Sequence, residues 1–353
     1  MKKKIIIALI LICLTLVILA IPQINLYLAG AKKTLNNQDV EFYFRGNLET
    51  NELAELLIKE GFLKDKEGFL KVANYKRLKK SKLSAGKYII KAKTPIRHLL
   101  NGFTLNSKGN GNAEVEVDVT FNNCRDIYQL CGKVAKNLML DSSLLATYIT
   151  SDECLSKYDF TLEQLPSLFL PNTYKMYWDT DEKAFVERMA KEFKQFWTTE
   201  RKNKIKSIGL ESPSQVVTLA SIVYSEQSRN PSEWPIIAGL YLNRINKGIK
   251  LQSDPTFKFC WGNALDSVQR LTFEHRDKDC PYNTYIYSGL PPGPICIPPV
   301  KVVDAVLNRE KNEFLFLIAK PDYSGLHDFS VDYSKHSFLA KKYSQWLVSE
   351  GIR

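Results

Sequence analysis

The chain has 353 residues, 44% of them hydrophobic and 25% charged, which is enough to build two domain cores. It carries 49 Lys and Arg against 38 Asp and Glu, a formal charge of +11, so we expect an anionic partner: nucleic acid, a membrane surface or an acidic polymer. The sequence contains no C-x-x-C, H-E-x-x-H, G-x-S-x-G or P-loop, which argues against the zinc, redox, serine-hydrolase and nucleotide-binding classes that these motifs mark.

The N-terminus predicts a membrane anchor at residues 1–30. Three lysines precede an uncharged apolar run at 5–21, and with the residues behind it the stretch reaches the roughly 20 residues that cross a bilayer. Lysines on that side predict a cytoplasmic N-terminus and an exported remainder. A cleavable signal peptide is the alternative, since "AGA" at 29–31 resembles a cleavage site, but the apolar run is longer than usual for one.

The predicted export of the chain narrows the choice of anionic partner. A single-pass protein of the plasma (inner) membrane, with its bulk on the extracytoplasmic side, has no access to chromosomal DNA. We therefore expect no nucleic-acid partner and favour material of the cell envelope.

Residues 38–104 read as a small separate module. Its first part predicts two short helices, the first with Thr50 as N-cap and leucines on one face. A turn, a strand at 87–91 and a third short helix follow. The polar, Gly-rich "NSKGNGN" at 106–112 predicts a linker or an exposed hairpin tip.

The region 113–353 opens on strictly alternating residues that predict a strand at 113–121. Helices are expected around 125–137 and 141–149, followed by an irregular or extended stretch at 165–178. A long helix is expected at 181–200, with an apolar stripe that indicates core packing rather than a ligand site. The stripe consists of Phe185, Met189, Phe193 and Phe196.

Two further helices have well-marked starts. Ser212 suits an N-cap, with Gln215 three residues later to complete a capping box. Ser232 is the expected cap of a helix at 233–247, which ends before a glycine. The segment "LQSDPTFKF" at 251–259 is expected to be extended, as a residue before proline prefers.

Glu226 interrupts an apolar helix face. It follows Ile222 by four residues and Val223 by three, so it extends the buried stripe. Desolvation raises the pKa of such a carboxyl, and a protonated acid near neutral pH is what general acid catalysis needs. The alternatives are an exposed last turn or a structural ion pair with Arg229 or Arg244.

Seven cysteines are present, one of them, Cys13, in the apolar N-terminal run. The other six allow fifteen disulfide pairings in an exported protein, and the expected outcome is a few buried thiols with one or two bridges. These six are Cys124, Cys131, Cys154, Cys260, Cys280 and Cys296.

Several motifs in order resemble the MltG (YceG-like) endolytic murein transglycosylases. They are "LASIVYSEQS…PIIAGLYLNRINKGIKLQSDPT", "YNTYIYSGLPPGPICIP" and "FLFLIAKPDYSGLHDFS…HS", with "LFLPNTY" at 168–174 similar to the family's "LFPDTY". "LSAGKY" resembles part of that family's LysM-like domain. The resemblance implies an α+β fold: a transmembrane helix, a LysM-like module at 38–104, and a mixed α/β catalytic domain at 113–353 with a glycan-binding groove.

The resemblance implies a reaction that one acid can perform. The family cleaves the MurNAc-β-1,4-GlcNAc bond as a lyase, with the substrate's own C6 hydroxyl attacking the anomeric carbon to leave a 1,6-anhydro sugar. Ordinary glycosidases need two carboxylates. Glu226 would act first as acid and then as base, with no metal and no cofactor. The family's helix usually has a second acid, and here that position is Tyr224.

Substrate-binding candidates follow from the same motifs. Their side chains offer hydroxyls, amides and ring faces suited to sugars, although each has a structural alternative as a helix end, a turn, a strand residue or a satisfied histidine. "GLPPGPI" at 289–295 is expected to be rigid scaffold beside the cleft. The candidates are Asn243, Arg244, Gln252, Ser253, Asp254, Thr256, Tyr282, Asn283, Thr284, Tyr285 and His327.

The expected partners are peptidoglycan glycan strands, the membrane and, by family analogy, cell-wall synthases; the enzyme is expected to end the elongation of nascent strands. Two rival functions stay open. One is a peptidoglycan-recognition factor with weakened catalysis, motivated by Tyr224. The other is a hydrolytic muramidase, for which Asp254 is the candidate second carboxylate.

Overall fold

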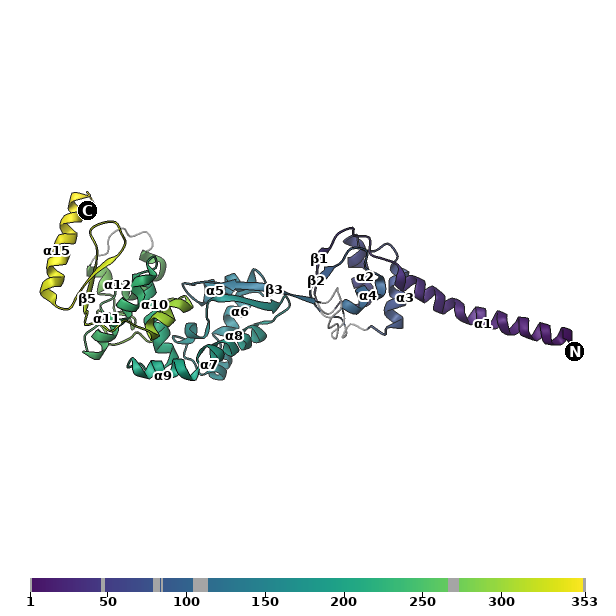
Figure 1. Cartoon of the computed structure of the whole chain (residues 1–353), viewed down its shortest axis with the longest axis horizontal. Helices are drawn as coiled ribbons and strands as arrows, with labels where there is room; N and C mark the ends of the chain where they lie inside the picture. The colour runs from purple at the N-terminus through teal and green to yellow at the C-terminus, as the bar shows by residue number, and fades with distance from the viewer. Residues whose placement is uncertain are drawn as a thin grey trace. The chain divides into compact units, whose positions relative to one another are not determined.

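The computed structural model contains both helices and sheets and begins with a long apolar helix (Figure 1). The linker predicted at 106–112 lies outside the residues that the structure describes. The described residues are 2–45, 48–78, 83, 85–103, 114–265 and 273–351.

The chain divides into two compact units, each with its own core. The N-terminal unit comprises Met1–Val119, Asn137–Met139 and Lys175–Thr180, and the C-terminal unit comprises Thr120–Lys136, Leu140–Tyr174 and Asp181–Arg353.

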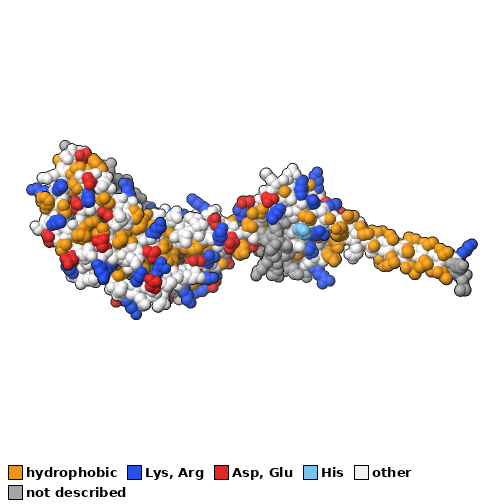
Figure 2. Space-filling view, viewed as in Figure 1, with side chains coloured by type: hydrophobic (Ala, Val, Ile, Leu, Met, Phe, Trp, Pro, Cys, Tyr) orange, Lys and Arg blue, Asp and Glu red, His pale blue; other side chains and the backbone are white. Residues whose placement is uncertain are grey.

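Helix α1 (Lys2–Ala31) is the predicted apolar segment. Residues Lys3–Ala31 are long and apolar enough to cross a membrane, and an 18-residue window within them has a mean hydropathy of 3.2 and no residue buried inside the protein. At the C-terminal end of the helix, Ala29 is buried in the core of the N-terminal unit. Figure 2 shows the hydrophobic side chains covering this helix. The helix is therefore compatible with a single-pass anchor, and a signal sequence meets the same criterion of length and composition.

In the N-terminal unit, two strands enclose two helices in sequence. Strand β1 pairs antiparallel with β2, with Phe42 opposite Tyr88. The rings of Phe42, Phe44, Tyr88 and Phe103 meet in the core. The elements are β1 (Val40–Phe44), α2 (Thr50–Lys59), α3 (Lys66–Tyr75), β2 (Gly86–Ile90) and α4 (Ile96–Gly102).

The prediction of Thr50 as the cap of α2 was wrong. Thr50 is the first helical residue, and the N-cap is Glu49, whose backbone N–H donates to Oε2 of Glu52 at 2.7 Å. The reciprocal capping box therefore forms one residue earlier than the sequence signal suggested. The predicted strand at 87–91 is β2, one residue earlier at each end.

A four-stranded sheet has the order β1-β2-β3-β4. Strand β3 (Glu114–Phe121) pairs antiparallel with β2, with Val115 opposite Lys87. Strand β4 (Asn172–Tyr177) follows the short 3-10 helix η2 (Leu165–Leu168), which confirms the irregular and extended structure expected there.

The C-terminal unit is mainly helical, with an antiparallel hairpin of β5 and β6. Its helices are α5 (Ile127–Ala135), α6 (Ser142–Ile149), α7 (Asp152–Tyr158), α8 (Glu182–Phe196), α9 (Thr199–Ser207), α10 (Pro213–Glu226), α11 (Trp234–Asn246), α12 (Asp254–Trp261), α13 (Phe273–Arg276), α14 (Val300–Leu307) and α15 (Tyr333–Ser349). The 3-10 helices η3 (Pro231–Glu233) and η4 (Gly262–Leu265) and the strands β5 (Phe316–Ala319) and β6 (His327–Ser330) also belong to it.

The single helix predicted at 181–200 is two helices. Helix α8 ends before Trp197, and the hydroxyl of Thr198 accepts the N–H of Arg201 at 3.3 Å to start α9. A cap at Thr198 thus outweighs the continuing helical pattern. The stripe packs against the core as expected: Phe185 and Met189 are buried, and Phe193 and Phe196 are partly buried against the core cluster.

Helix α10 is surrounded by other helices and packs against α11, α12 and α14. The N–H of Gln215 donates to the hydroxyl of Ser212 at 3.2 Å, which confirms the predicted cap. Gln215 does not complete a capping box, because its side chain accepts the N–H of Glu211 instead. Burial continues along the helix from Val216 to Val223, so its C-terminal residue, Glu226, ends a core element.

Two predictions near the next helices were wrong. The residue before α11 is Glu233, not Ser232, because η3 takes up the residues before it. The segment expected to be extended at 251–259 forms α12 from Asp254 onward. Pro255 lies in the first turn of α12, where its missing N–H has no helical partner to lose.

The cysteines follow the expected mixture of buried thiols and a bridge. Cys260 and Cys280 form a disulfide, which links α12 to the segment after α13. The buried free thiols are Cys124, Cys131 and Cys154, and Cys296 is half-buried.

Candidate active site

A pocket of about 390 Å³ in the C-terminal unit contains the Glu226 side chain. Its walls come from α11, the turn before α12, the segment around β5 and helix α15. These elements are far apart in the sequence, so the pocket exists only in the folded unit. The lining residues are Glu226, Leu240, Tyr241, Arg244, Leu251, Gln252, Asp254, Tyr285, Leu315, Phe316, Leu317, Ile318 and His336.

The Glu226 carboxyl group is held by two hydroxyls. Tyr241 donates to Oε1 at 2.6 Å and Ser253 donates to the same oxygen at 2.5 Å. Burial raises the pKa of Glu226; the two hydrogen bonds and the charge of His327 oppose that rise, while the charge of Asp254 adds to it. The net direction is upward, which favours the protonated acid that the helix pattern predicted.

A second carboxylate lines the same pocket. Asp254, the first residue of α12, accepts a hydrogen bond from the Tyr285 hydroxyl at 2.6 Å. Burial, aided by Asp254, raises the pKa of Tyr285, so this phenol stays a donor. The Arg276 guanidinium lies 5.2 Å from the centre of the Tyr285 ring. Asp254 and Tyr285, both predicted site residues, are thus hydrogen-bonded to each other in the pocket that contains Glu226.

Arg244 shapes the pocket from within it. This buried guanidinium donates to the carbonyl of Lys250 at 2.6 Å, to that of Leu315 at 2.7 Å and to Oε1 of Gln252 at 2.6 Å. Gln252 has a φ of +51°, a conformation that side-chain-bearing residues rarely adopt. Arg244 therefore stabilises the turn that presents Ser253 to Glu226.

Four predicted residues form a buried network behind the lining. The Thr284 hydroxyl accepts the N–H of Ser253 at 3.0 Å, and the Thr256 hydroxyl donates to the carbonyl of Ser253 at 2.6 Å. Asn283 donates from its amide to the carbonyls at 276 and 278. Thr256 and Thr284 thus hold the turn, and Asn283 holds the segment at 276–278. Apart from the Ser253 hydroxyl on Glu226, these groups are not part of the pocket lining.

Three other candidates also lie outside the lining. The Asn243 amide donates to the carbonyls of Asn312 at 2.8 Å and Phe314 at 3.1 Å, which holds the segment before β5. Tyr282 packs its ring 4.6 Å from that of Phe259, and burial raises its pKa to about 12. The His327 ring contacts a different acid, Glu233, which is described below.

Tyr224, at the position where an acid was expected, does not line the pocket. Its half-buried ring packs against the core and lies 6.5 Å from that of Trp234. Burial raises the pKa of this phenol. The side chain therefore extends the core.

Sequence reasoning missed several lining residues, among them Tyr241, Phe316 and His336. Tyr241 had a usable signal, because it precedes Arg244 by three residues and so shares its helix face. Phe316 and His336 lie within the quoted "FLFLIAK…HS" motif, but nothing in it marked them as lining residues. Their rings stack 5.0 Å apart, and only the fold brings them to α11. Burial lowers the pKa of His336, which favours a neutral imidazole on this wall.

Comparison with known proteins gives one consistent family. The model of the YceG-like family matches residues 43–342. An endolytic murein transglycosylase of Bacillus subtilis is 29% identical over 169 residues, which cover 47% of this chain and 44% of that protein. A protein of the same name from Streptococcus pneumoniae is 26% identical over 212 residues, covering 54% of this chain and 37% of that protein.

The chain thus aligns with less than half the length of these curated relatives. The fold has a counterpart in the crystal structure of a YceG-like protein from Listeria monocytogenes. That structure superposes with a TM-score of 0.54 at 20% identity, over 86% of this chain and 99% of the other.

Proposed function

Since this chain belongs to the YceG-like family, we propose that it is an endolytic peptidoglycan transglycosylase with Glu226 as its catalytic acid and base. The observation that carries the proposal is the carboxyl group of Glu226. Burial raises its pKa, and it lies in a polar pocket under two hydroxyl donors. Relatives named endolytic murein transglycosylase support the reaction class.

In the proposed reaction, protonated Glu226 donates its proton to the glycosidic oxygen between MurNAc and GlcNAc as that bond breaks. The carboxylate then accepts the C6 hydroxyl proton of the same MurNAc while that oxygen bonds to the anomeric carbon. The product is a 1,6-anhydroMurNAc end, and the acid is regenerated. Tyr241 and Ser253 stabilise the intermediate carboxylate by donating to Oε1.

We assign direct sugar contacts to the candidates that line the pocket: Arg244, Gln252, Asp254 and Tyr285. The rings of Tyr285 and Phe316 suit the apolar faces of a pyranose. The remaining candidates support the site from behind through the turn and the segment that they hold. These are Asn243, Ser253, Thr256, Tyr282, Asn283, Thr284 and His327.

The wider assignments belong to the same proposal. Helix α1 would anchor the protein in the plasma (inner) membrane, with residues 113–353 as the extracytoplasmic catalytic domain. Residues 38–104 would form a LysM-like module, supported by their strand–helix–helix–strand order and the antiparallel pair of β1 and β2. The enzyme would cleave nascent strands near the synthases and end their elongation. A protease-protection assay on membrane vesicles tests the topology.

Mass spectrometry of uncrosslinked glycan strands tests the reaction. The full chain in detergent is compared with Glu226→Gln. AnhydroMurNAc ends from the parent and none from the variant support the proposal. Strands bound by both proteins but cut by neither would instead indicate a recognition factor.

A hydrolytic muramidase is the second candidate, favoured by the presence of Asp254 in the same pocket. It would leave reducing ends and depend on two carboxylates. Asp254→Asn separates the two reactions. A hydrolase would lose its cleavage with this variant, whereas the transglycosylase keeps making anhydro ends at a reduced rate.

A further inference from the structure

Gln227, the residue after the proposed catalytic acid, is buried and fully hydrogen-bonded. Its amide nitrogen donates to Oε2 of Glu233 and to the carbonyl of Gly325, both at 2.8 Å. Its side-chain oxygen accepts the N–H groups of Arg229 and Asn230 at 3.1 Å. Its carbonyl accepts the indole N–H of Trp234 at 2.6 Å. The C-terminal end of α10 is therefore fixed through this one residue.

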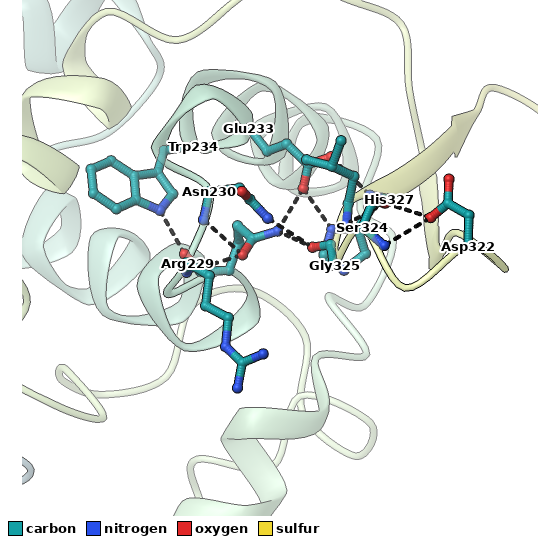
Figure 3. A network of polar contacts seen from close by, with 10 residues as sticks. Arg229, Asn230, Glu233, Trp234, Asp322, Ser324, Gly325 and His327 are labelled. Atoms are coloured by element: carbon teal, nitrogen blue, oxygen red, sulfur yellow. Dashed lines mark hydrogen bonds and ion pairs between the residues drawn. The ribbon is translucent and has the colours of Figure 1, made fainter. Parts of the chain in front are cut away.

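Glu233 is a buried carboxylate with three donors. Besides Gln227, its Oε1 accepts the backbone N–H of His327 at 2.8 Å, and its Oε2 lies 2.8 Å from Nδ1 of the same histidine. The side chains of Glu233 and His327 are only 7% and 13% exposed. Figure 3 shows Glu233 with Asn230 and Trp234 on one side and the loop that carries Gly325 and His327 on the other.

The element on the far side of Glu233 is a wall of the pocket. His327 begins β6 and pairs with Ala319 of β5. Strand β5 and the residue before it contribute Leu315, Phe316, Leu317 and Ile318 to the lining. The Glu233 carboxylate is thus hydrogen-bonded both to Gln227, the neighbour of Glu226, and to the hairpin whose first strand lines the same pocket as Glu226.

We propose that Glu233 is a positioning residue, which sets the location of the Glu226 carboxyl group relative to the β5 wall by binding Gln227 and His327 together. The proposal rests on the proposed function, because it takes Glu226 as the acid. The loop end of the link is itself ordered: the Gly325 carbonyl also accepts the Asn230 amide at 3.1 Å, and the N–H of Lys320 donates to the carbonyl of Leu326 at 2.8 Å. Proton transfer depends on sub-ångström placement of the acid, and distant changes that shift it are costly.

The test is Glu233→Gln in the full chain, assayed by anhydro-end formation on uncrosslinked strands. Glutamine keeps the shape and removes the charge, but its single oxygen cannot accept from all three donors. We expect kcat to fall roughly 10- to 100-fold with KM within about threefold, since the acid moves while the sugar contacts stay.

The matched control is Glu192→Gln. It removes an acid that accepts from Arg188 at 2.7 Å within α8, away from α10. We expect its kcat to stay at the parent value. A wild-type kcat for Glu233→Gln, a loss confined to KM, or an equal loss in Glu192→Gln would overturn the positioning role.

A second variant covers the case in which Glu233→Gln does not fold. His327→Gln leaves the backbone N–H on Glu233 and keeps a side-chain donor, so we expect a fall in kcat of roughly 3- to 10-fold. An unchanged kcat here would sink the idea. Glu226→Gln, run in parallel, separates the two proposals. If it retains full turnover, the proposed function fails; if it is inactive while the Glu233 and His327 variants are fully active, only the positioning role fails.

Discussion

The two units bury different kinds of side chain. In the N-terminal unit the described core is almost entirely aliphatic and aromatic, and its buried polar residues, Thr34 and Thr94, hydrogen-bond each other. The C-terminal unit buries a whole polar set around its pocket. Apolar burial stabilises a fold without directing any one atom, whereas hydrogen-bonded polar groups fix positions. The buried polar set consists of Gln227, Glu233, Arg244, Ser253, Thr256, Asn283 and Thr284.

The largest expected effect is the loss of the acid. Glu226→Gln should lower the rate of anhydro-end formation by at least about 10²- to 10⁴-fold, the usual contribution of general acid–base catalysis. The fold should persist, because glutamine can still accept from Tyr241 and Ser253. Circular dichroism beside the mass-spectrometric assay checks both points.

The same variant carries a pH signature of stability. Because the folded-state pKa of Glu226 is raised above its ordinary 4.5, its stabilising contribution is present below that pH and is lost as the pH rises through the folded value. The melting temperature of the parent should therefore fall relative to that of Glu226→Gln as the pH increases above 4.5. If the melting temperatures of the two proteins instead keep a constant difference across that pH range, burial does not raise the pKa of Glu226.

The next largest effect breaks the N-terminal core. Phe103 is fully buried against Phe42, Phe44 and Tyr88, so Phe103→Ala should cost about 3–5 kcal/mol in the unfolding of this unit. Turnover of short strands below the melting transition should be unchanged. Calorimetry with kinetics measures both, with the exposed Tyr75→Ala as control. A parallel loss of kcat would show that the apolar unit also determines the site.

Removing the disulfide should have a smaller effect, confined to the C-terminal unit. Cys260 and Cys280 are separated by 20 residues, and a loop of this size contributes about 3 kcal/mol by restricting the unfolded chain. Replacing both by serine should lower the C-terminal transition in calorimetry and leave the N-terminal one in place. A shift of both transitions would contradict their separate cores.

The smallest effect tests one hydroxyl on the acid. Tyr241→Phe removes a hydrogen bond that lowers the pKa of Glu226, so that pKa should rise and the alkaline limb of kcat/KM should move to higher pH. We expect about a tenfold loss of rate, as the intermediate carboxylate loses a charge-assisted donor. Tyr282→Phe, outside the pocket lining, is the control and should leave the limb in place.

Local signals predicted much of the secondary structure. Ser212 as a cap and the alternating strand at β3 were both confirmed, since each depends on neighbouring residues alone. The errors came where two local rules compete. Thr198 starts a new helix inside a continuing apolar pattern, and Pro255 opens a helix where the residue before it favoured an extended chain.

Local signals also predicted part of the candidate site. The period of α10 put Glu226 on the buried face, and burial does raise its pKa. The ordered motifs also pointed to Arg244, Gln252, Asp254 and Tyr285, which line its pocket. They did not separate these from Asn243, Thr256 and Asn283, because a polar side chain that lines a pocket and one that holds a turn have the same sequence signal.

The sequence by itself determined the apolar N-terminal helix and the helix that ends in Glu226, since these follow from composition and periodicity over short stretches. Its ordered motifs, by their resemblance to those of known proteins, also indicated the family. Only the tertiary structure decided that Tyr241 and Ser253 share one oxygen of Glu226, and that Glu233 binds both Gln227 and His327. Such pairs join residues up to 94 positions apart. Their geometry depends on how whole helices and a hairpin pack, which no local pattern encodes.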